Sequence, residues 1–293
     1  MTVAVLGPGA VGGVLAVGLV RAGVRVVCVA RPDTAELIAS EGLSLKRPEG
    51  TEAARPEATS ELQEPVELLL VTVKAPTLED ALGRVQVPAQ SVIPLLNGIE
   101  HMGTIRSALP GATVVAGSVS LIEAYLERAG TIVQTTPAVV VTLAAEAEVG
   151  TTKLLGRSGA EVRVNGSEAK VLWDKLARQA PVAAATTIAQ RPIGELRSDP
   201  EWRRRLEEAV NETCAVAARE DVQLTPEAQL EIIDAMPPRL TSSTARDVAA
   251  GRPSELDAIT GAAVRAGRRA GVPMPALERL LAEAEDACRA PSL

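Results

Sequence analysis

The chain has 293 residues with a formal net charge of −7, of which 46% are hydrophobic and 1% are aromatic. This length suits one large domain or two ordinary ones, and the hydrophobic fraction is enough for a sizeable core built from Ala, Val, Leu and Ile. The acidic balance argues against non-specific binding to nucleic acid or to acidic membranes, and the scarcity of aromatic side chains argues against stacking on single-stranded nucleic acid.

The chain opens with a pattern that predicts a strand, a glycine turn and a helix. Residues 3–6 are apolar, residues 7–12 read Gly-Pro-Gly-Ala-Val-Gly, and residues 11–21 have a helical pattern. The first glycine permits the tight turn, the second lets the backbone approach a pyrophosphate, and the third lets helix and strand pack closely. The helix N-terminus offers N–H groups to phosphates. The expected contacts of a dinucleotide are therefore Gly7, Gly9, Ala10, Val11 and Gly12.

The same uncharged stretch, residues 3–20, could pass for a signal peptide or a membrane span. It lacks a basic segment before it, and the Gly-Pro-Gly turn interrupts it. Three cysteines without paired spacing, Cys28, Cys214 and Cys288, indicate reduced thiols. We therefore expect a cytoplasmic protein.

The second predicted strand, residues 24–29, indicates which dinucleotide is bound. Chains that bind NAD usually place Asp or Glu at the end of this strand, whereas this chain has Arg31, 19 residues after Gly12. A guanidinium suits a 2′-phosphate through paired hydrogen bonds, and the alternative is a solvated loop arginine. We expect NADP(H) as the cofactor.

The rest of the first half alternates between helices and strands. A capping box at residues 33–36 predicts a short helix that ends near Gly42, and residues 77–80 resemble another helix start. Strands are expected over 66–73, 91–96, 113–121 and 161–164. The strand-like runs 131–136 and 138–143, on either side of Pro137, suggest an antiparallel pair at the edge of the sheet.

After Asn165-Gly166 the pattern becomes helical. Helix starts are expected at Ser167, Asp199-Pro200, Thr225-Pro226 and Ser254. The sequence thus predicts an α/β fold in two domains. Residues 1–165 would form a Rossmann-type domain with a mostly parallel sheet, and residues 166–293 would form an all-helical domain that contributes to substrate binding and catalysis.

Few residues in this chain are candidates for the chemistry. The single histidine, His101, excludes a histidine-rich metal cluster, and no metal is expected. Lys175 shares a helix face with the apolar residues Val171, Leu172 and Leu176. Such a lysine either extends to the rim of the apolar stripe or faces a cleft as a partly desolvated ammonium with a lowered pKa. Periodicity alone leaves both alternatives open.

Two other polar positions follow predicted strands. Lys74 and Asn97 each stand just past the carboxyl end of a strand, where parallel sheets hold cofactors and substrates. The alternatives are a loop residue before a helix for Lys74 and a simple turn for Asn97-Gly98. Further along, Ser254-x-x-Asp257 forms a capping box, which explains Asp257 as a structural residue and leaves Glu255 open.

These residues, in this order, resemble the ketopantoate reductase (2-dehydropantoate 2-reductase) family over nearly the whole chain. The resemblance rests on GPGAVGG at 7–13, Ala30-Arg31-Pro32, VTVKA at 71–75, Asn97-Gly98, LWDKLA at 172–177, GEL at 194–196, Ser242-Ser243, Ser254-Glu255-Leu256-Asp257 and GVPMP at 271–275. It implies reduction of a branched 2-oxo acid to a 2-hydroxy acid by NADPH, and it suggests a homodimer.

The resemblance also implies roles for individual residues. Lys175 matches the catalytic lysine and Glu255 the acidic residue of the active site. Asn97 matches an asparagine near nicotinamide and substrate, Ser243 a contact of the substrate carboxylate, and Lys74, like Arg31 and the glycines, an NADPH contact. Gln179 stands where the family has an asparagine that holds lysine and substrate.

The chain departs from the family pattern after the lysine. Besides Gln179, two further asparagine positions read Ala183 and Ile193, whose side chains cannot form hydrogen bonds. The hypothesis is therefore an NADPH-dependent reductase, with 2-dehydropantoate as the first substrate. The alternatives are a reductase of a more apolar 2-oxo acid and a non-catalytic NADP(H)-binding protein.

Overall fold

The computed structural model describes residues 1–87, 89–120, 122–136 and 138–289. The chain forms two compact units: residues 1–96 with 101–171, and residues 97–100 with 172–293. The chain passes into the second unit along α6 (Glu168–Ala189), shortly after the boundary expected at residue 165. The short segment 97–100 belongs to the second unit although the residues on both sides of it belong to the first.

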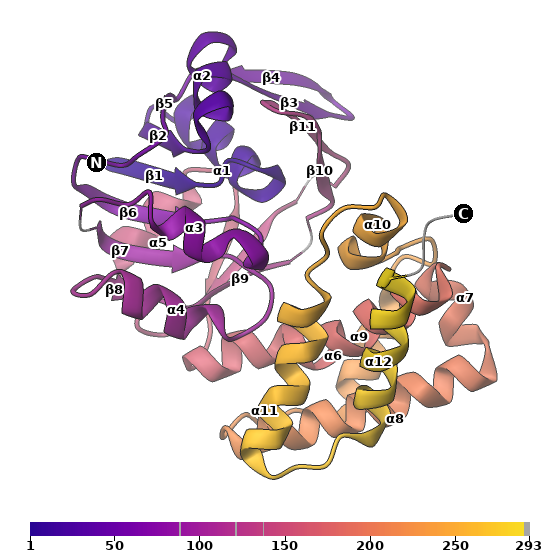
Figure 1. The fold of residues 1–293 in the computed structure, drawn as a ribbon. Coiled ribbons are helices and arrows are strands. Elements are labelled where there is room, and N and C mark those ends of the chain that lie inside the picture. Colours follow the sequence, from indigo (N-terminus) through magenta and orange to yellow (C-terminus); the bar gives the residue numbers. More distant parts are fainter. Residues whose placement is uncertain (88, 121, 137, 290–293) are drawn as a thin grey trace. The chain divides into compact units, whose positions relative to one another are not determined.

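The first unit is built on a six-stranded parallel sheet (Figure 1). Its strands, in sheet order, are β5 (Glu57–Thr59), β2 (Arg25–Val29), β1 (Thr2–Leu6), β6 (Val66–Val71), β7 (Ala89–Pro94) and β8 (Thr113–Val114). The order reverses between β1 and β6, as in the classical dinucleotide-binding sheet. The expected α/β fold with a helical C-terminal region is confirmed.

Apolar cores lie on both faces of this sheet because the residues of β1 alternate between them. Val3 and Val5 pack in one core with residues of α1 and α5, whereas Ala4 and Leu6 pack in the other with residues of α3 and α4. The helices are α1 (Ala10–Arg21), α2 (Pro32–Glu41), α3 (Leu78–Leu82), α4 (His101–Ala108) and α5 (Val149–Gly156), with a 3₁₀ turn η1 (Ala75–Thr77).

The ends of the early helices follow from local sequence. Gly23 adopts a φ of +73° after α1, and the N–H groups of Gly23 and Val24 donate to the carbonyls of Val20 and Leu19. This is a Schellman motif, for which glycine is the preferred residue. The capping box expected at residues 33–36 is wrong: α2 begins at Pro32 with Arg31 as its N-cap residue, because proline is favoured in the first helical turn.

The expected antiparallel pair of strands around Pro137 is also wrong. The strand β11 (Thr131–Gln134) joins a sheet in the order β10-β11-β3-β4, and β12 (Val140–Leu143) joins another in the order β13-β12-β9. The remaining strands are β3 (Leu43–Arg47), β4 (Gly50–Ala54), β9 (Gly117–Ser120), β10 (Ala124–Arg128) and β13 (Glu161–Val164). A strand-like pattern specifies extended backbone but not its partner, and β3, which pairs with β11, had not been predicted. The strand expected over 113–121 is instead β8 and β9, and Leu121 and Pro137 lie outside the described residues.

The described part of the second unit is helical. Its helices after α6 are α7 (Ile193–Ser198), α8 (Pro200–Arg219), α9 (Pro226–Ala235), α10 (Ser243–Ala249), the π-helical turn η2 (Asp257–Gly261), α11 (Ala262–Ala270) and α12 (Pro275–Arg289). The starts expected at Asp199 and Thr225 are confirmed, because each side chain accepts N–H bonds from the first turn that follows. The start expected at Ser167 is confirmed as well, since its hydroxyl accepts from the Lys170 N–H at 3.3 Å.

Both tryptophans lie in this unit. Trp173 is fully buried in α6, and its indole N–H donates to the Glu220 carboxylate at 2.8 Å. Trp202 lies in α8 with the Arg205 guanidinium 4.4 Å from its ring centre. Because a buried indole N–H needs a hydrogen-bond acceptor, the Glu220 carboxylate is the partner that Trp173 requires.

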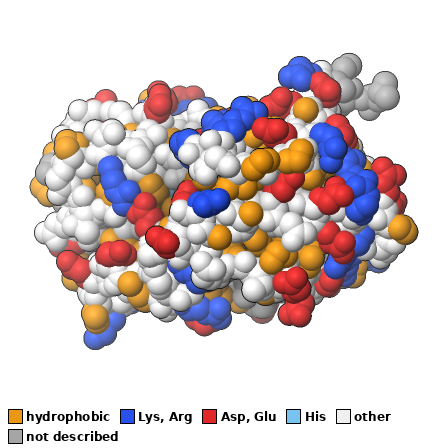
Figure 2. Space-filling model, turned by 90° about the horizontal axis from the view of Figure 1, so that it is seen from below, with side chains coloured by type: hydrophobic (Ala, Val, Ile, Leu, Met, Phe, Trp, Pro, Cys, Tyr) orange, Lys and Arg blue, Asp and Glu red, His pale blue; other side chains and the backbone are white. Residues whose placement is uncertain are grey.

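The surface mixes charges of both signs. On α8, Arg203 and Arg204 pair with glutamates one turn later, and Arg205 pairs with Glu283 of α12. Figure 2 shows acidic and basic side chains intermingled on the face that it draws. Among the described residues, no helix combines the length and the apolar character needed to cross a membrane. The three cysteines, all described, are free.

Candidate active site

The glycine turn connects β1 to α1 at the carboxyl edge of the sheet. Gly7 has a φ of +84°, and its N–H donates to the Val29 carbonyl at 2.9 Å. A Cβ on Gly12 would lie 2.2 Å from Thr72 Oγ1, so only glycine allows α1 to approach the end of β6 this closely. The Thr72 hydroxyl donates to the Gly7 carbonyl at 2.7 Å and thereby links the turn to β6.

The start of α1 has the properties of a phosphate-binding site. Gly9 is its N-cap residue, and no side chain of the described residues caps the first turn. Ala10 and Val11 are partly exposed at this end. A Cβ on Gly9 would meet only the Gly7 carbonyl oxygen at 3.8 Å, so the space beside Gly9 is open. Exposed first-turn N–H groups and the positive end of the helix dipole favour an anion here.

Two basic residues follow the strands that flank β1, at the same edge of this sheet. Arg31 is exposed and lies two residues after the end of β2, as the N-cap residue of α2. Lys74 is exposed after β6 as the N-cap residue of η1. Since β2, β1 and β6 are adjacent and parallel, their carboxyl ends bring both side chains to the edge that carries the glycine turn.

The second unit holds a polar cluster centred on Asn97. Its Oδ1 accepts from Lys175 Nζ at 2.8 Å and from Gln179 Nε2 at 3.0 Å, and its Nδ2 donates to Glu255 Oε2 at 3.1 Å. The carboxamide orientation follows from these partners, because an ammonium needs an acceptor and a carboxylate needs a donor. Four residues that the sequence singled out are thus brought together from three segments of the chain.

The helix α6 supplies Lys175 and Gln179 from one face, four residues apart. Pro181 lies inside this helix and has no N–H, so the carbonyl of Ala177 loses its usual helical donor. The Thr213 hydroxyl of α8 donates to that carbonyl at 2.7 Å. The helix therefore continues through the proline directly after the residues that contact Asn97.

The electrostatics of the cluster favour proton transfer by Lys175. Burial lowers the pKa of its ammonium to about 8, the charge of Glu255 opposes that shift, and the charge of Arg178 adds to it. Arg178 lies one turn after Lys175 and has a pKa lowered by burial. Its i+3 spacing from Lys175 places the two side chains on the same side of α6, a relation that can be read from the sequence.

Glu255 is buried and stands just before η2. The capping box expected at Ser254-x-x-Asp257 is wrong, because the helical segment begins at Leu256 and no side chain caps η2. Asp257 instead accepts from Arg265 at 2.6 Å. A π-helical turn inserts one residue into a helix and recurs at functional sites.

Other candidates lie outside the Asn97 cluster. Ser243 is exposed at the first position of α10, and its neighbour Ser242 caps that helix and accepts from Thr186 Oγ1 at 2.7 Å. His101 is buried at the first position of α4 in the first unit. Among the described residues, no group of three or more His, Cys, Asp or Glu side chains is placed to hold a metal ion.

The two positions that depart from the family pattern are both buried. Ala183, in α6, is 1% exposed, and Ile193, at the start of α7, packs in the apolar core of the second unit with Leu206 and Val210. Neither side chain can contribute a hydrogen bond.

The sheet order, the glycine turn and the buried lysine together define a class of two-unit, dinucleotide-binding oxidoreductases. Comparison with known proteins identifies the family within this class. A family model described as ketopantoate reductase PanE/ApbA matches residues 3–146, and one described as ketopantoate reductase PanE/ApbA C terminal matches residues 169–286. The chain therefore belongs to the ketopantoate reductase family, as its motifs indicated.

Curated relatives agree with this assignment. A 2-dehydropantoate 2-reductase of Caulobacter vibrioides is 30% identical over 285 residues, which cover 94% of this chain and 95% of that protein. An uncharacterized oxidoreductase of Bacillus subtilis, YkpB, is 27% identical over 291 residues, which cover 95% of this chain and 96% of that protein.

Solved structures show the same fold. A PanE/ApbA family ketopantoate reductase from Ralstonia eutropha has a TM-score of 0.87 at 28% identity, with 99% of each chain covered. A D-mandelate dehydrogenase in complex with NADH and anilino(oxo)acetate has a TM-score of 0.89 at 22% identity, with 99% of this chain and 98% of that chain covered. At 22% identity, the similarity to the D-mandelate dehydrogenase is one of fold alone.

Proposed function

We propose that this protein is an NADPH-dependent reductase that converts a 2-oxo acid, first of all 2-dehydropantoate, to the 2-hydroxy acid. The observation that carries the proposal is the Asn97 carboxamide, which joins Lys175 to Glu255 through hydrogen bonds of 2.8 and 3.1 Å. A buried ammonium with a pKa near neutrality, fixed by an amide, suits a proton donor for a carbonyl reduction. Membership of the ketopantoate reductase family supports the same chemistry.

The residues at the carboxyl edge of the six-stranded sheet fit a dinucleotide phosphate. The open space beside Gly9 and the uncapped first turn at Ala10, Val11 and Gly12 suit a pyrophosphate. Arg31 has a guanidinium for a 2′-phosphate, and Lys74 adds a positive charge at the same edge. We therefore propose NADP(H) rather than NAD(H).

In this mechanism a bound NADPH would supply the hydride for the substrate's C2 carbonyl carbon. The Lys175 ammonium donates a hydrogen bond to the carbonyl oxygen, stabilises the negative charge that develops there and then releases a proton to it. Asn97 holds Nζ through its Oδ1, and Glu255 fixes the other end of that carboxamide. Gln179, Ser243 and Glu255 are proposed to bind substrate hydroxyl and carboxylate groups.

The first experiment compares lysine variants in NADPH oxidation with 2-dehydropantoate. Lys175→Ala should lower kcat by at least ~10²-fold with NADPH binding intact, because the proton donor is lost. Lys153→Ala, which removes an exposed lysine of α5, is the matched control and should behave as wild type. Near-normal turnover in Lys175→Ala would refute the assignment of the proton donor.

Cofactor choice is tested separately with Arg31→Ala. If Arg31 binds the 2′-phosphate, its loss should raise the KM for NADPH by about tenfold or more, which corresponds to one charge-assisted contact of about 1.5–3 kcal/mol. The KM for NADH, which lacks that phosphate, should change little. Equal effects on both cofactors would contradict the role.

A more apolar 2-oxo acid is a second candidate substrate, and Ala183 and Ile193 favour it. A site that lacks two amide side chains loses about 1–3 kcal/mol for each hydrogen bond that a substrate hydroxyl would have formed. A panel of 2-oxo acids with and without a hydroxyl, compared by kcat/KM, distinguishes the candidates. NADPH binding without turnover of any of them would indicate a non-catalytic protein.

A further inference from the structure

The segment that carries Asn97 is very short and is packed tightly within the second unit. Gly98 follows Asn97 with a φ of +85°, and a Cβ there would lie 2.0 Å from the carbonyl oxygen of Ala258 in η2. Only glycine permits this approach. The position of Asn97 thus depends on how residues 97–100 lie against η2 and α11.

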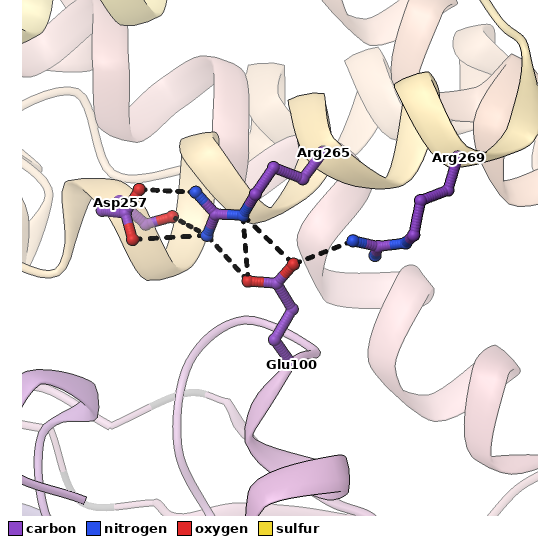
Figure 3. Close-up of polar contacts among 4 residues, drawn as sticks. All are labelled: Glu100, Asp257, Arg265 and Arg269. Atoms are coloured by element: carbon purple, nitrogen blue, oxygen red, sulfur yellow. Dashed lines mark hydrogen bonds and ion pairs between the residues drawn. The ribbon is translucent and has the colours of Figure 1, made fainter.

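Glu100, at the other end of this segment, forms the second attachment. Its two carboxylate oxygens each accept from Arg265 Nε at 3.1 Å, one of them also accepts from Arg265 Nη2 at 2.7 Å, and the other accepts from Arg269 Nη1 at 3.0 Å. Figure 3 shows the carboxylate of Glu100 between the two arginines of α11. Asp257 holds the far edge of the Arg265 guanidinium at 2.6 Å.

We propose that Glu100 and Arg265 are positioning residues for the reaction: they clamp segment 97–100 onto η2 and α11 and so fix the Asn97 carboxamide toward Lys175. This inference rests on the proposed function, since it assigns to both residues an effect on the step that Lys175 performs. Neither residue contacts Lys175 in the hydrogen bonds that hold the Asn97 cluster.

The geometry sets this clamp apart from an ordinary surface ion pair. Isolated exposed ion pairs contribute little to stability, whereas a network of several charges joined by paired hydrogen bonds keeps its side chains in a single arrangement. Here one carboxylate binds two arginines, and one arginine binds two carboxylates. The arginine bonds also lower the pKa of the Glu100 carboxyl, so the clamp stays charged at neutral pH. Only two residues, Gly98 and Ile99, separate Glu100 from Asn97, so a shift of Glu100 is passed along the chain to Asn97.

The test compares Glu100→Gln with a matched control, Glu278→Gln. Glu278 accepts from Arg268, which also lies in α11, at 3.0 Å, but it does not hold segment 97–100. Glu100→Gln should lower kcat about tenfold and leave the KM for NADPH within about twofold, because small misplacements of positioned groups cost rate. Glu278→Gln should match wild type in both. In addition, Glu100→Gln combined with Arg265→Gln should lower kcat by less than the product of the two single effects, because both substitutions remove the same ion pair while Arg269 is a further partner of Glu100.

A second readout does not need activity. The Asn97 side-chain NH₂ signal in a proton–nitrogen NMR spectrum, assigned by its loss in Asn97→Ala, should shift or broaden in Glu100→Gln and stay in place in Glu278→Gln. An unchanged signal, or the same change in both variants, would overturn the clamp. If the wild-type protein reduces no 2-oxo acid, the proposed function fails, while the NMR comparison still decides whether Glu100 positions Asn97.

Discussion

Thr213→Val is expected to destabilise the second unit by about 1–3 kcal/mol, the cost of leaving a buried acceptor without a donor. The acceptor is the carbonyl of Ala177, which Pro181 deprives of its helical N–H donor and to which the Thr213 hydroxyl donates at 2.7 Å. Thr213 is fully buried. Valine replaces the hydroxyl with a methyl group of similar size, so the hydrogen bond accounts for most of the change.

Thr260→Val is the matched control for this prediction. Thr260 is also fully buried and its hydroxyl donates to the Ala180 carbonyl at 3.0 Å, but that carbonyl keeps the N–H of Ala184 as its helical donor. Loss of the Thr260 hydroxyl should therefore lower the free energy of unfolding of the second unit by no more than about 1 kcal/mol.

The free energies are measured by urea-dependent amide hydrogen exchange, read by mass spectrometry on peptides of α6 and α8. This readout is local to the second unit, so it does not require the two units to unfold together. In a Pro181→Ala background, which restores an N–H for Ala177, Thr213→Val should cost less than in the wild-type background. A cost for Thr213→Val no greater than that for Thr260→Val would refute the reasoning.

Three further predictions follow from the site. The pKa of Lys175 is lowered to about 8, so the rate of 2-oxo acid reduction should fall above about pH 8 as the ammonium is lost. The rate of hydroxy acid oxidation should rise over the same range. A reduction rate that stays flat to about pH 10 would contradict the role of Lys175 as proton donor. Gly12→Ala should abolish NADPH binding in a fluorescence titration or prevent folding, since the alanine Cβ would lie 2.2 Å from Thr72 Oγ1. Wild-type affinity for NADPH would contradict this prediction and show that the glycine turn can move. Gly98→Ala should lower kcat about tenfold or more in steady-state assays while NADPH binding stays normal. The reason is that the alanine Cβ would lie 2.0 Å from the Ala258 carbonyl oxygen and displace Asn97. An unchanged kcat would contradict this prediction.

Features that depend on nearby residues could be predicted from the sequence. The glycine turn and the caps at Asp199 and Thr225 are each set by a few adjacent residues, and the structure confirms the helix starts at Asp199 and Thr225. The antiparallel pair around Pro137 failed because the choice of strand partner is not local: β11 pairs with β3, which lies far away in sequence.

The candidate site divides in the same way. The apolar stripe predicted the face of Lys175 but not its degree of burial, and the resemblance singled out Asn97 and Glu255 without their contacts. The hydrogen bonds of the Asn97 cluster depend on how α6, segment 97–100 and the residues before η2 pack together in the fold. The capping box at Ser254 failed because Asp257 binds Arg265, a partner outside any local window.

The placement of Trp173 and Trp202 gives the molecule an intrinsic optical label. Both indoles belong to the helical unit, whereas the chain contains no phenylalanine and its single tyrosine, Tyr125, lies in β10 of the other unit. Tryptophan emission therefore reports on the helical unit, and the reduced nicotinamide of the proposed NADPH would act as an acceptor for it. Energy transfer on cofactor binding would then measure the separation of the two units in solution without any added dye.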